Sequence, residues 1–163
     1  MGLLGIVWGT STGWSQEARW EPLGPEGGNF AGIIVDVSDE QKVTAITSSP
    51  ASTYRSLDGG ASWNQLSDIS NSSISDFLAI DSSNFLASSY GTVYRTANAG
   101  GRWSQISISY EDGYPLYMAK HPTVSNTVYA VGYGYNYQGG NFSYRMVFFT
   151  GATGGRQWKS AKI

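Results

Sequence analysis

A short glycine- and tryptophan-containing motif recurs along this 163-residue chain. The first copy, residues 56–63, reads Ser-Leu-Asp-Gly-Gly-Ala-Ser-Trp, and the second, residues 96–103, reads Thr-Ala-Asn-Ala-Gly-Gly-Arg-Trp. A looser third copy ends at Trp158 and carries one extra residue after its threonine. Trp20 resembles the end of a further copy, so successive motif tryptophans are 43, 40 and 55 residues apart. A repeat of this length indicates an array of similar supersecondary units.

Each unit divides into four short segments separated by turns rich in Ser, Asp, Asn or Pro. The first segments are 33–36, 77–80 and 117–120, and the second segments are 43–47, 85–89 and 128–133. The third segment ends at the Ser or Thr of the motif, and the fourth begins at its Trp. Four short strands in a unit of roughly 40 residues are typical of a β-propeller blade. We therefore predict an all-β propeller of four-stranded antiparallel blades.

The predicted propeller is incomplete. Residues 19–163 accommodate about three blades, at 27–67, 68–107 and 108–163, and residues 20–23 are expected to be the closing strand of a missing blade. A closed propeller has about four to eight blades. We therefore expect the remaining blades to come from a longer chain or from another copy of this one.

The N-terminal residues differ from the repeats. Residues 3–8 are apolar and are followed by small and polar residues, as in a secretory signal, although a positively charged start is missing. We interpret residues 1–18 as a shortened export signal, the alternative being a disordered leader. The interpretation predicts a secreted, periplasmic or extracellular protein.

Composition excludes several classes of function. The formal net charge is −2 and charged residues make up 13%, which is unlike a basic nucleic-acid binder. There are no cysteines, so disulfides, thiolate zinc sites and cysteine nucleophiles are excluded, and His121 is the sole histidine. No apolar run approaches the roughly 18–20 residues that span a bilayer. We expect no cofactor, no metal site, no nucleic-acid partner and no membrane span.

The motif itself supplies the parts of a tight turn. An Asp or Asn side chain accepts hydrogen bonds from backbone N–H groups one or two residues on, and glycine allows positive φ. We expect the tryptophan to pack against the sheet and the hydroxyl to bond across the hairpin. These structural positions are Ser56, Asp58, Gly60 and Trp63, then Thr96, Asn98, Gly100 and Trp103, then Thr150, Thr153, Gly155 and Trp158. Nothing in the motif requires catalysis.

The pattern Ser-x-Asp-x-Gly-x-x-Trp resembles the Asp-box of bacterial neuraminidase (BNR) repeats. Such repeats occur in sialidase-like, sortilin-like and xyloglucanase-like propellers and in photosystem II assembly factors, and the resemblance covers residues 20–163. The second copy replaces Asp with Asn98, and the third replaces it with Thr153. In these families the Asp-box is a scaffold element away from the active centre, so the resemblance implies the fold and not the function.

The resemblance also gives no catalytic residues. Arg55 and Arg95 precede Asp-box segments, unlike the arginine that begins the carboxylate-binding triad of sialidases. Xyloglucanase-like enzymes carry an aspartate where residues 47–51 have no carboxylate. We therefore predict an exported scaffold that binds a protein or a carbohydrate, with no catalytic centre in this chain. The alternative is the N-terminal fragment of a glycoside hydrolase whose carboxylates lie on missing blades.

The third unit contains an insertion. It is 15 residues longer than the second, and the excess falls within residues 132–145. Insertions in repeats map to loops that often bind ligands, and tyrosine with amide side chains can stack on sugars or contact proteins. The candidate ligand residues are Tyr133, Tyr135, Asn136, Tyr137, Gln138 and Tyr144. The alternative, which we favour, is an extended hairpin with tyrosines that have no ligand.

Other polar residues have structural interpretations. Arg55 and Arg95 recur at one blade position, where packing or salt bridges between blades are favoured over an anion-binding ring. His121 precedes Pro122 in a turn, which favours a surface role over catalysis. The acidic residues 36, 39 and 40 are interpreted as a solvated corner, with a cation site as the alternative.

Overall fold

The computed structural model describes residues 29–70, 73–89, 92–106, 108, 114–139 and 141–162, which form three antiparallel sheets. Sheet 1 contains β1 (Asn29–Asp36), β2 (Asp39–Ser49), β3 (Ala51–Ser56) and β4 (Asn64–Ser70). Sheet 2 contains β5 (Ile74–Ala79), β6 (Phe85–Ser89), β7 (Thr92–Thr96) and β8 (Ser104–Ile106). Sheet 3 contains β9 (Tyr114–Lys120), β10 (Val128–Gln138), β11 (Asn141–Ala152) and β12 (Gln157–Lys162). The predicted all-β fold of four-stranded antiparallel units is confirmed.

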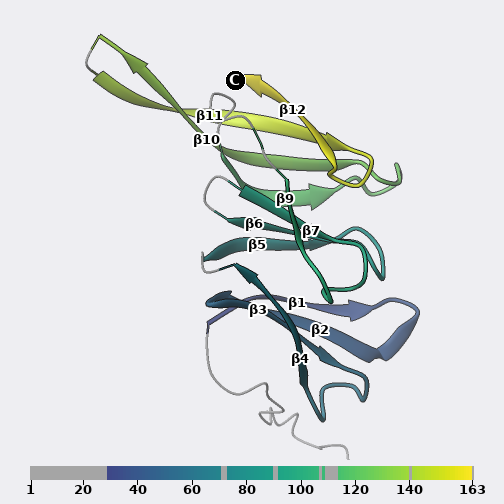
Figure 1. The fold of residues 1–163 in the computed structure, drawn as a ribbon. Coiled ribbons are helices and arrows are strands. Elements are labelled where there is room, and N and C mark those ends of the chain that lie inside the picture. The colour runs from purple at the N-terminus through teal and green to yellow at the C-terminus, as the bar shows by residue number, and fades with distance from the viewer. Residues whose placement is uncertain are drawn as a thin grey trace, which may run out of the picture.

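The three sheets lie one after another in chain order (Figure 1). The first strand of each sheet contacts the first strand of the next, β1 against β5 and β5 against β9. This arrangement places the first strands together and the fourth strands outward, as in the blades of a propeller. No helix of the described residues has the length and hydropathy of a membrane span.

The strand register identifies equivalent positions in the three sheets. The pairing of the second strand with the third begins at equivalent pairs in the three sheets, namely Val43–Ser56, Phe85–Thr96 and Val128–Gly151. Counting from these pairs relates every residue of one sheet to residues of the others. The repeat in the sequence is therefore a repeat in three dimensions.

Apolar side chains fill the spaces between the sheets. Between sheets 1 and 2, Ala51 packs with Ile74 and Ala87, and Phe77 and Trp103 cover them. Between sheets 2 and 3, Leu86, Val93 and Val128 form the buried cluster, joined by Met118 and Trp158. In both cases the tryptophan comes from the later sheet and lies against the earlier one.

The insertion in the third unit lengthens two strands. β10 and β11 pair without interruption from Val128–Gly151 to Gln138–Asn141. The resulting hairpin extends beyond the other strands of the molecule (Figure 1). The inserted residues are thus an extended hairpin. The proposed export signal at residues 1–18 and the strand expected at residues 20–23 lie outside the described residues.

Candidate functional site

The first motif closes a turn through its serine and aspartate. The Ser56 hydroxyl donates to Asp58 Oδ1 at 2.7 Å and accepts from the Gly60 N–H at 2.8 Å. Asp58 Oδ1 also accepts from the Ser62 N–H at 2.8 Å, and Oδ2 accepts from the Ser62 hydroxyl at 2.6 Å. These bonds, those from Ser62 first, lower the pKa of Asp58 to about 2. The expectation that the aspartate accepts from N–H groups one or two residues on is wrong, because its backbone donor lies four residues on.

The second motif makes the same turn with a neutral side chain. Thr96 Oγ1 donates to Asn98 Oδ1 at 2.8 Å and accepts from the Gly100 N–H at 3.1 Å. Asn98 Oδ1 accepts from the Arg102 N–H at 2.9 Å. The turn requires an acceptor oxygen at this position, and a negative charge is not needed.

The third motif does not have the threonine at the expected place. The register puts Gly151, and not Thr150, at the position of Ser56 and Thr96. Thr150 is exposed, and counting from Gly151 the third motif has the same length as the other two, without an extra residue. A Cβ on Gly151 would lie 3.2 Å from the Trp158 ring, so the ring occupies the space of the missing side chain. The third motif therefore has no hydroxyl at this position, and the Gly155 N–H donates to the Ala152 carbonyl at 3.1 Å instead.

All three turns bind the first turn of their own sheet. Each donates one backbone N–H to a carbonyl there: Gly59 to Gln41 at 3.0 Å, Ala99 to Ser83 at 2.8 Å and Gly154 to Asn126 at 2.9 Å. The motif therefore connects the third-to-fourth strand turn to the first-to-second strand turn. These contacts are structural.

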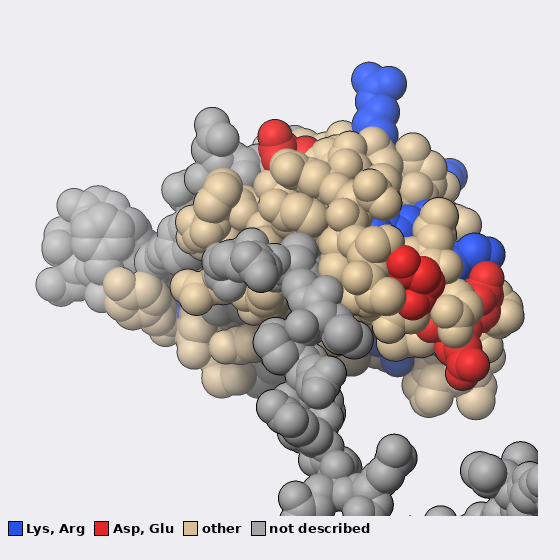
Figure 2. Space-filling model, turned by 90° about the horizontal axis from the view of Figure 1, so that it is seen from below, with Lys and Arg blue, Asp and Glu red and all other residues tan. Residues whose placement is uncertain are grey.

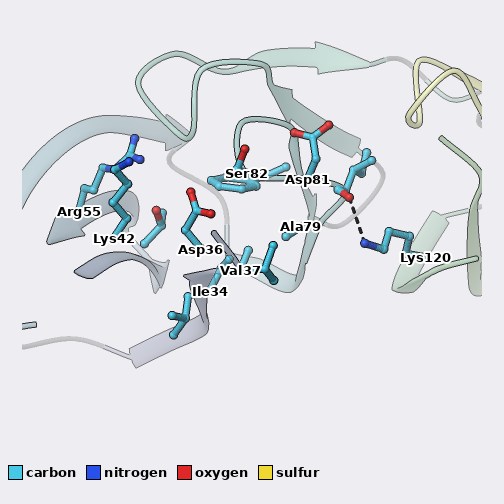
Figure 3. Close-up of a pocket in the computed structure, with 13 residues that line it drawn as sticks. Ile34, Asp36, Val37, Lys42, Arg55, Ala79, Asp81, Ser82 and Lys120 are labelled. Carbon is cyan, nitrogen blue, oxygen red and sulfur yellow. Dashed lines mark hydrogen bonds between the residues drawn. The ribbon is translucent and has the colours of Figure 1, made fainter. Parts of the chain in front are cut away.

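A pocket lies where the first turns of sheets 1 and 2 meet, with Lys120 of sheet 3 at its edge (Figure 3). Its volume is about 80 Å³. Arg55 and Lys42 lie side by side on one side of it, and Asp36 and Asp81 project into its middle (Figure 3). Lys120 Nζ donates to the Ile80 carbonyl at 3.1 Å.

The two recurring arginines differ in their partners. Arg95 donates through Nε to the Gly154 carbonyl of sheet 3 at 3.3 Å, and through its terminal nitrogen to Asn84 Oδ1. Arg95 therefore joins two sheets, as its recurrence predicts. At the equivalent position in sheet 1, Arg55 Nε is buried and has no hydrogen-bond partner among the described residues.

A second difference lies in the neighbouring strand. The register places Lys42 of sheet 1 where sheet 2 has Asn84, since each directly precedes the first residue of the second-to-third strand pairing. An ammonium group cannot accept a hydrogen bond, so Lys42 cannot replace the amide acceptor that Asn84 offers to a terminal nitrogen of Arg95. Two cations thus stand together where sheet 2 has an arginine and an amide. Aligning residues 43–47 with 85–89 places Lys42 opposite Asn84, so the sequence alone shows this exchange. That Lys42 and Arg55 line one pocket is seen only in the structure.

Both carboxylates of the pocket already have partners. Asp36 Oδ1 accepts from the Ser38 hydroxyl at 2.7 Å and the Ser38 N–H at 2.9 Å, and these bonds lower its pKa. Burial alone would raise the pKa of Asp81, but hydrogen bonds from Ser83 and Asn84 outweigh it and the pKa is lowered. A general acid of a glycosidase needs a raised pKa. This pair is therefore suited to closing turns and not to protonating a leaving group.

The remaining candidate residues lie apart from the pocket. Tyr133 and Tyr144 are exposed on the extended hairpin. The register places positions 135–138 along the same hairpin, and their side chains lie outside the described part of the structure. His121 Nδ1 accepts from the backbone N–H groups of Thr123 at 3.2 Å and Val124 at 2.9 Å, so it closes a turn.

The acidic corner of sheet 1 is neutralised locally. Asp39 pairs with Lys42 at 3.0 Å, and this contact lowers the pKa of Asp39. Acidic side chains gather on the side of the molecule where the β1–β2 turn lies, with basic groups beside them (Figure 2). Within the described residues, no group of three or more His, Asp or Glu side chains could hold a metal ion.

No family model and no curated protein matches the sequence. Solved structures do match, and they give a class of fold. The class is a propeller built from four-stranded sheets. The chain is similar to YCF48 from Cyanidioschyzon merolae, with a TM-score of 0.62, 19% identity, and coverage of 90% of this chain and 42% of that one. It is also similar to YCF48 bound to D1 peptide, with a TM-score of 0.59, 13% identity, and coverage of 83% and 40%.

A weaker overlap is found with an ancestral GH74 enzyme, with a TM-score of 0.44, 12% identity, and coverage of 82% of this chain and 26% of that one. The chain therefore spans about two fifths of the length of the two YCF48 structures it matches. The similarity to the YCF48 structures is one of fold.

Proposed function

We propose that this chain is part of a non-catalytic propeller scaffold that binds a polypeptide partner by an acidic group of that partner. The observation that carries the proposal is the pocket beside Arg55 and Lys42, two cations that replace an arginine–amide pair of the next sheet. Arg55 lines the pocket, and a guanidinium forms strong charge-assisted hydrogen bonds with a carboxylate.

The size of the pocket supports a protein ligand over a sugar or small metabolite. Small-molecule sites are clefts of roughly 300–1,000 Å³, whereas this one measures about 80 Å³. Such a space accepts a single side-chain carboxylate or a chain terminus, while the rest of the partner lies on the surface. The solved structure of YCF48 with a D1 peptide supports the same class of ligand, since that protein shares this fold.

The proposal includes export from the cytoplasm, which rests on the apolar segment at residues 3–8. Fractionation of cells that express the full chain with a C-terminal tag tests this part separately. Accumulation of the protein in the cytoplasmic fraction, with residues 1–18 intact, contradicts export and leaves the binding proposal standing.

Fluorescence anisotropy with a fluorescein-labelled octaglutamate peptide tests the binding site. We expect saturable binding by the full chain and no binding of a labelled octalysine peptide. Arg55→Gln is expected to weaken octaglutamate binding about tenfold, because a charge-assisted hydrogen bond contributes roughly 1.5–3 kcal/mol. Lys159→Gln is the matched control, since Lys159 is an exposed cation on β12 outside the pocket.

The outcomes separate the ligand classes. Equal octaglutamate affinity of the Arg55→Gln and wild-type chains, with both folded by circular dichroism, contradicts the proposed site. Binding of labelled cellohexaose in place of octaglutamate contradicts the protein-ligand class and favours a carbohydrate. An absence of octaglutamate binding at millimolar concentration contradicts the proposal altogether.

A further inference from the structure

In sheets 1 and 2, one face is covered by the next sheet along the chain. In sheets 1 and 2 the residues at the centre of that face are fully buried: Ile46 and Thr53 in sheet 1, Ser88 and Val93 in sheet 2. Trp103 of sheet 2 covers this face of sheet 1 and donates a hydrogen bond to Thr53. Trp158 of sheet 3 covers this face of sheet 2 and packs against Val93. We call this the trailing face of each sheet.

No sheet of the described residues covers the trailing face of sheet 3. Its Val131 is equivalent to Ile46 and Ser88, which are both 0% exposed, but it is 39% exposed. Met146 on the same face is 59% exposed, although the equivalent Ala51 is fully buried. Tyr117, paired with Val131, is 63% exposed. Large apolar side chains are thus exposed on this face, at Val131 where both other sheets are fully buried and at Met146 where sheet 1 is fully buried.

On the opposite face of sheet 1, which we call its leading face, the described residues likewise provide no covering sheet. Ile33 is equivalent to Phe77 and Met118, because all three pair with the same alanine position of the second strand. Phe77 and Met118 pack against the preceding sheet, whereas Ile33 is 64% exposed. Both halves of the sheet-to-sheet interface are therefore available on one chain.

The sizes of the residues at this contact favour the pairing of these two faces. Between sheets 1 and 2, the large Phe77 ring lies on Gly32, where a Cβ would be 3.2 Å from the ring. The position of Gly32 on the trailing face of sheet 3 is Tyr117, and the position of Phe77 on sheet 1 is Ile33. A large residue on the trailing face would thus meet a smaller residue on the leading face.

We infer that copies of this chain associate head to tail, with the trailing face of sheet 3 docked on the leading face of sheet 1 of a second copy. The contact continues the interface that already joins sheets 1, 2 and 3. A heterologous contact gives a ring when its rotation closes, and the three sheets described in each of two copies would together supply six, within the range of about four to eight blades of closed propellers. This inference does not depend on the proposed ligand site, which uses other residues.

Sedimentation velocity of the full chain from 1 to 100 µM tests the inference. We expect a species of two chains that dissociates on dilution. Val131→Lys and Ile33→Lys, each on a different face, are expected to sediment as monomers. Val124→Lys is the control, because Val124 is an exposed apolar residue in a turn of sheet 3 away from both faces.

Mixing the two variants identifies the geometry. The Ile33→Lys chain keeps an intact trailing face and the Val131→Lys chain keeps an intact leading face, so the mixture is expected to regain a two-chain species through one contact. A wild-type chain that is monomeric at 100 µM overturns the inference. Loss of association in Val131→Lys but not in Ile33→Lys also overturns it, because it indicates a symmetric contact between two trailing faces. If either variant is unfolded by circular dichroism, Tyr117→Lys replaces Val131→Lys and Ile33→Gln replaces Ile33→Lys in the same mixture.

Discussion

The residues of the motif show which parts of a recurring turn are essential. Asp58 and Asn98 each accept a bond from the N–H four residues on, so the shared requirement is an oxygen acceptor. The hydroxyl is kept in two copies and replaced in the third, where the Trp158 ring fills the space at Gly151. The repeat therefore tolerates change wherever another group of the same sheet takes over the role.

The charge of Asp58 predicts a specific acid sensitivity. Its pKa is about 2 in the folded state and 3.8 in its ordinary state, so between these values the folded chain binds fewer protons than the unfolded chain. This contribution to stability is complete above about pH 4 and is lost as the pH falls towards 2. Asp58→Asn, which copies the second motif, is expected to unfold at a urea midpoint that changes less between pH 6 and pH 2.5 than that of the wild type.

The reverse substitution is the control for this prediction. Asn98→Asp places a carboxylate in the same turn, and we expect it to increase the difference between the two urea midpoints. An equal pH dependence of the wild-type, Asp58→Asn and Asn98→Asp chains would show that the carboxylate bonds do not contribute to stability.

At the scale of the strands, the sheets are held together by contacts that change character from one boundary to the next. Trp103 Nε1 donates to Thr53 Oγ1 of β3 at 2.9 Å. At the following boundary the position of Thr53 is Val93, and Trp158 Nε1 donates instead to the Gly155 carbonyl at 2.8 Å. Equivalent tryptophans thus make different contacts: Trp103 makes a polar contact with sheet 1, and Trp158 makes an apolar contact with sheet 2.

This difference predicts a rescue. Trp103→Phe leaves the fully buried Thr53 hydroxyl without its indole donor, and we expect the free energy of unfolding to fall by about 1–3 kcal/mol because an unsatisfied buried group is costly. Adding Thr53→Val, which copies the next boundary, is expected to recover part of the loss. Urea unfolding of the two single variants and the double variant measures the coupling, and additive effects would contradict a direct contact between the two side chains.

The strands and their order follow from the sequence, but several site residues do not. The repeated tryptophans and the alternation of apolar segments suffice to predict four strands a unit, because each unit has one solution that buries its apolar face. Sequence comparison aligns Thr150, and not Gly151, with Ser56 and Thr96, because the sequence does not show that Gly151 lies under the Trp158 ring. The unpaired Nε of Arg55 was missed because it depends on how the side chain packs between the sheets, which the sequence does not show.

At the scale of the whole molecule, the sheets form a row in which only sheet 2 has neighbours on both sides among the described residues. All five residues of β6 are buried, whereas Ile33 of sheet 1 and Val131 of sheet 3, on the faces without a neighbouring sheet, are 64% and 39% exposed. In an array of this kind, stability comes from each unit and its contacts with adjacent units. The ends of the row are therefore less stable than its middle.

Hydrogen exchange tests this gradient. At a concentration at which the chain is monomeric, we expect the β6 amides to exchange most slowly, and the β4 and β12 amides to exchange faster because local opening there exposes fewer buried contacts. Raising the concentration is expected to slow exchange in β1 and β10, which carry the proposed docking faces. Uniform protection of all three sheets in the monomer would indicate a single cooperative unit instead.

The residue beneath the indole ring is Thr53 at the first boundary between sheets and Val93 at the second. This difference matters for redesigning the order of the units. If a tryptophan that donates to a threonine hydroxyl were placed against a valine, its indole N–H would lose its acceptor. If a threonine were placed under a tryptophan that donates elsewhere, its buried hydroxyl would have no partner. The order of the units is thus favoured by the side-chain contacts between neighbouring units as well as fixed by the chain connections. Permuting or duplicating units would require that position 53 be transplanted together with the ring of position 103.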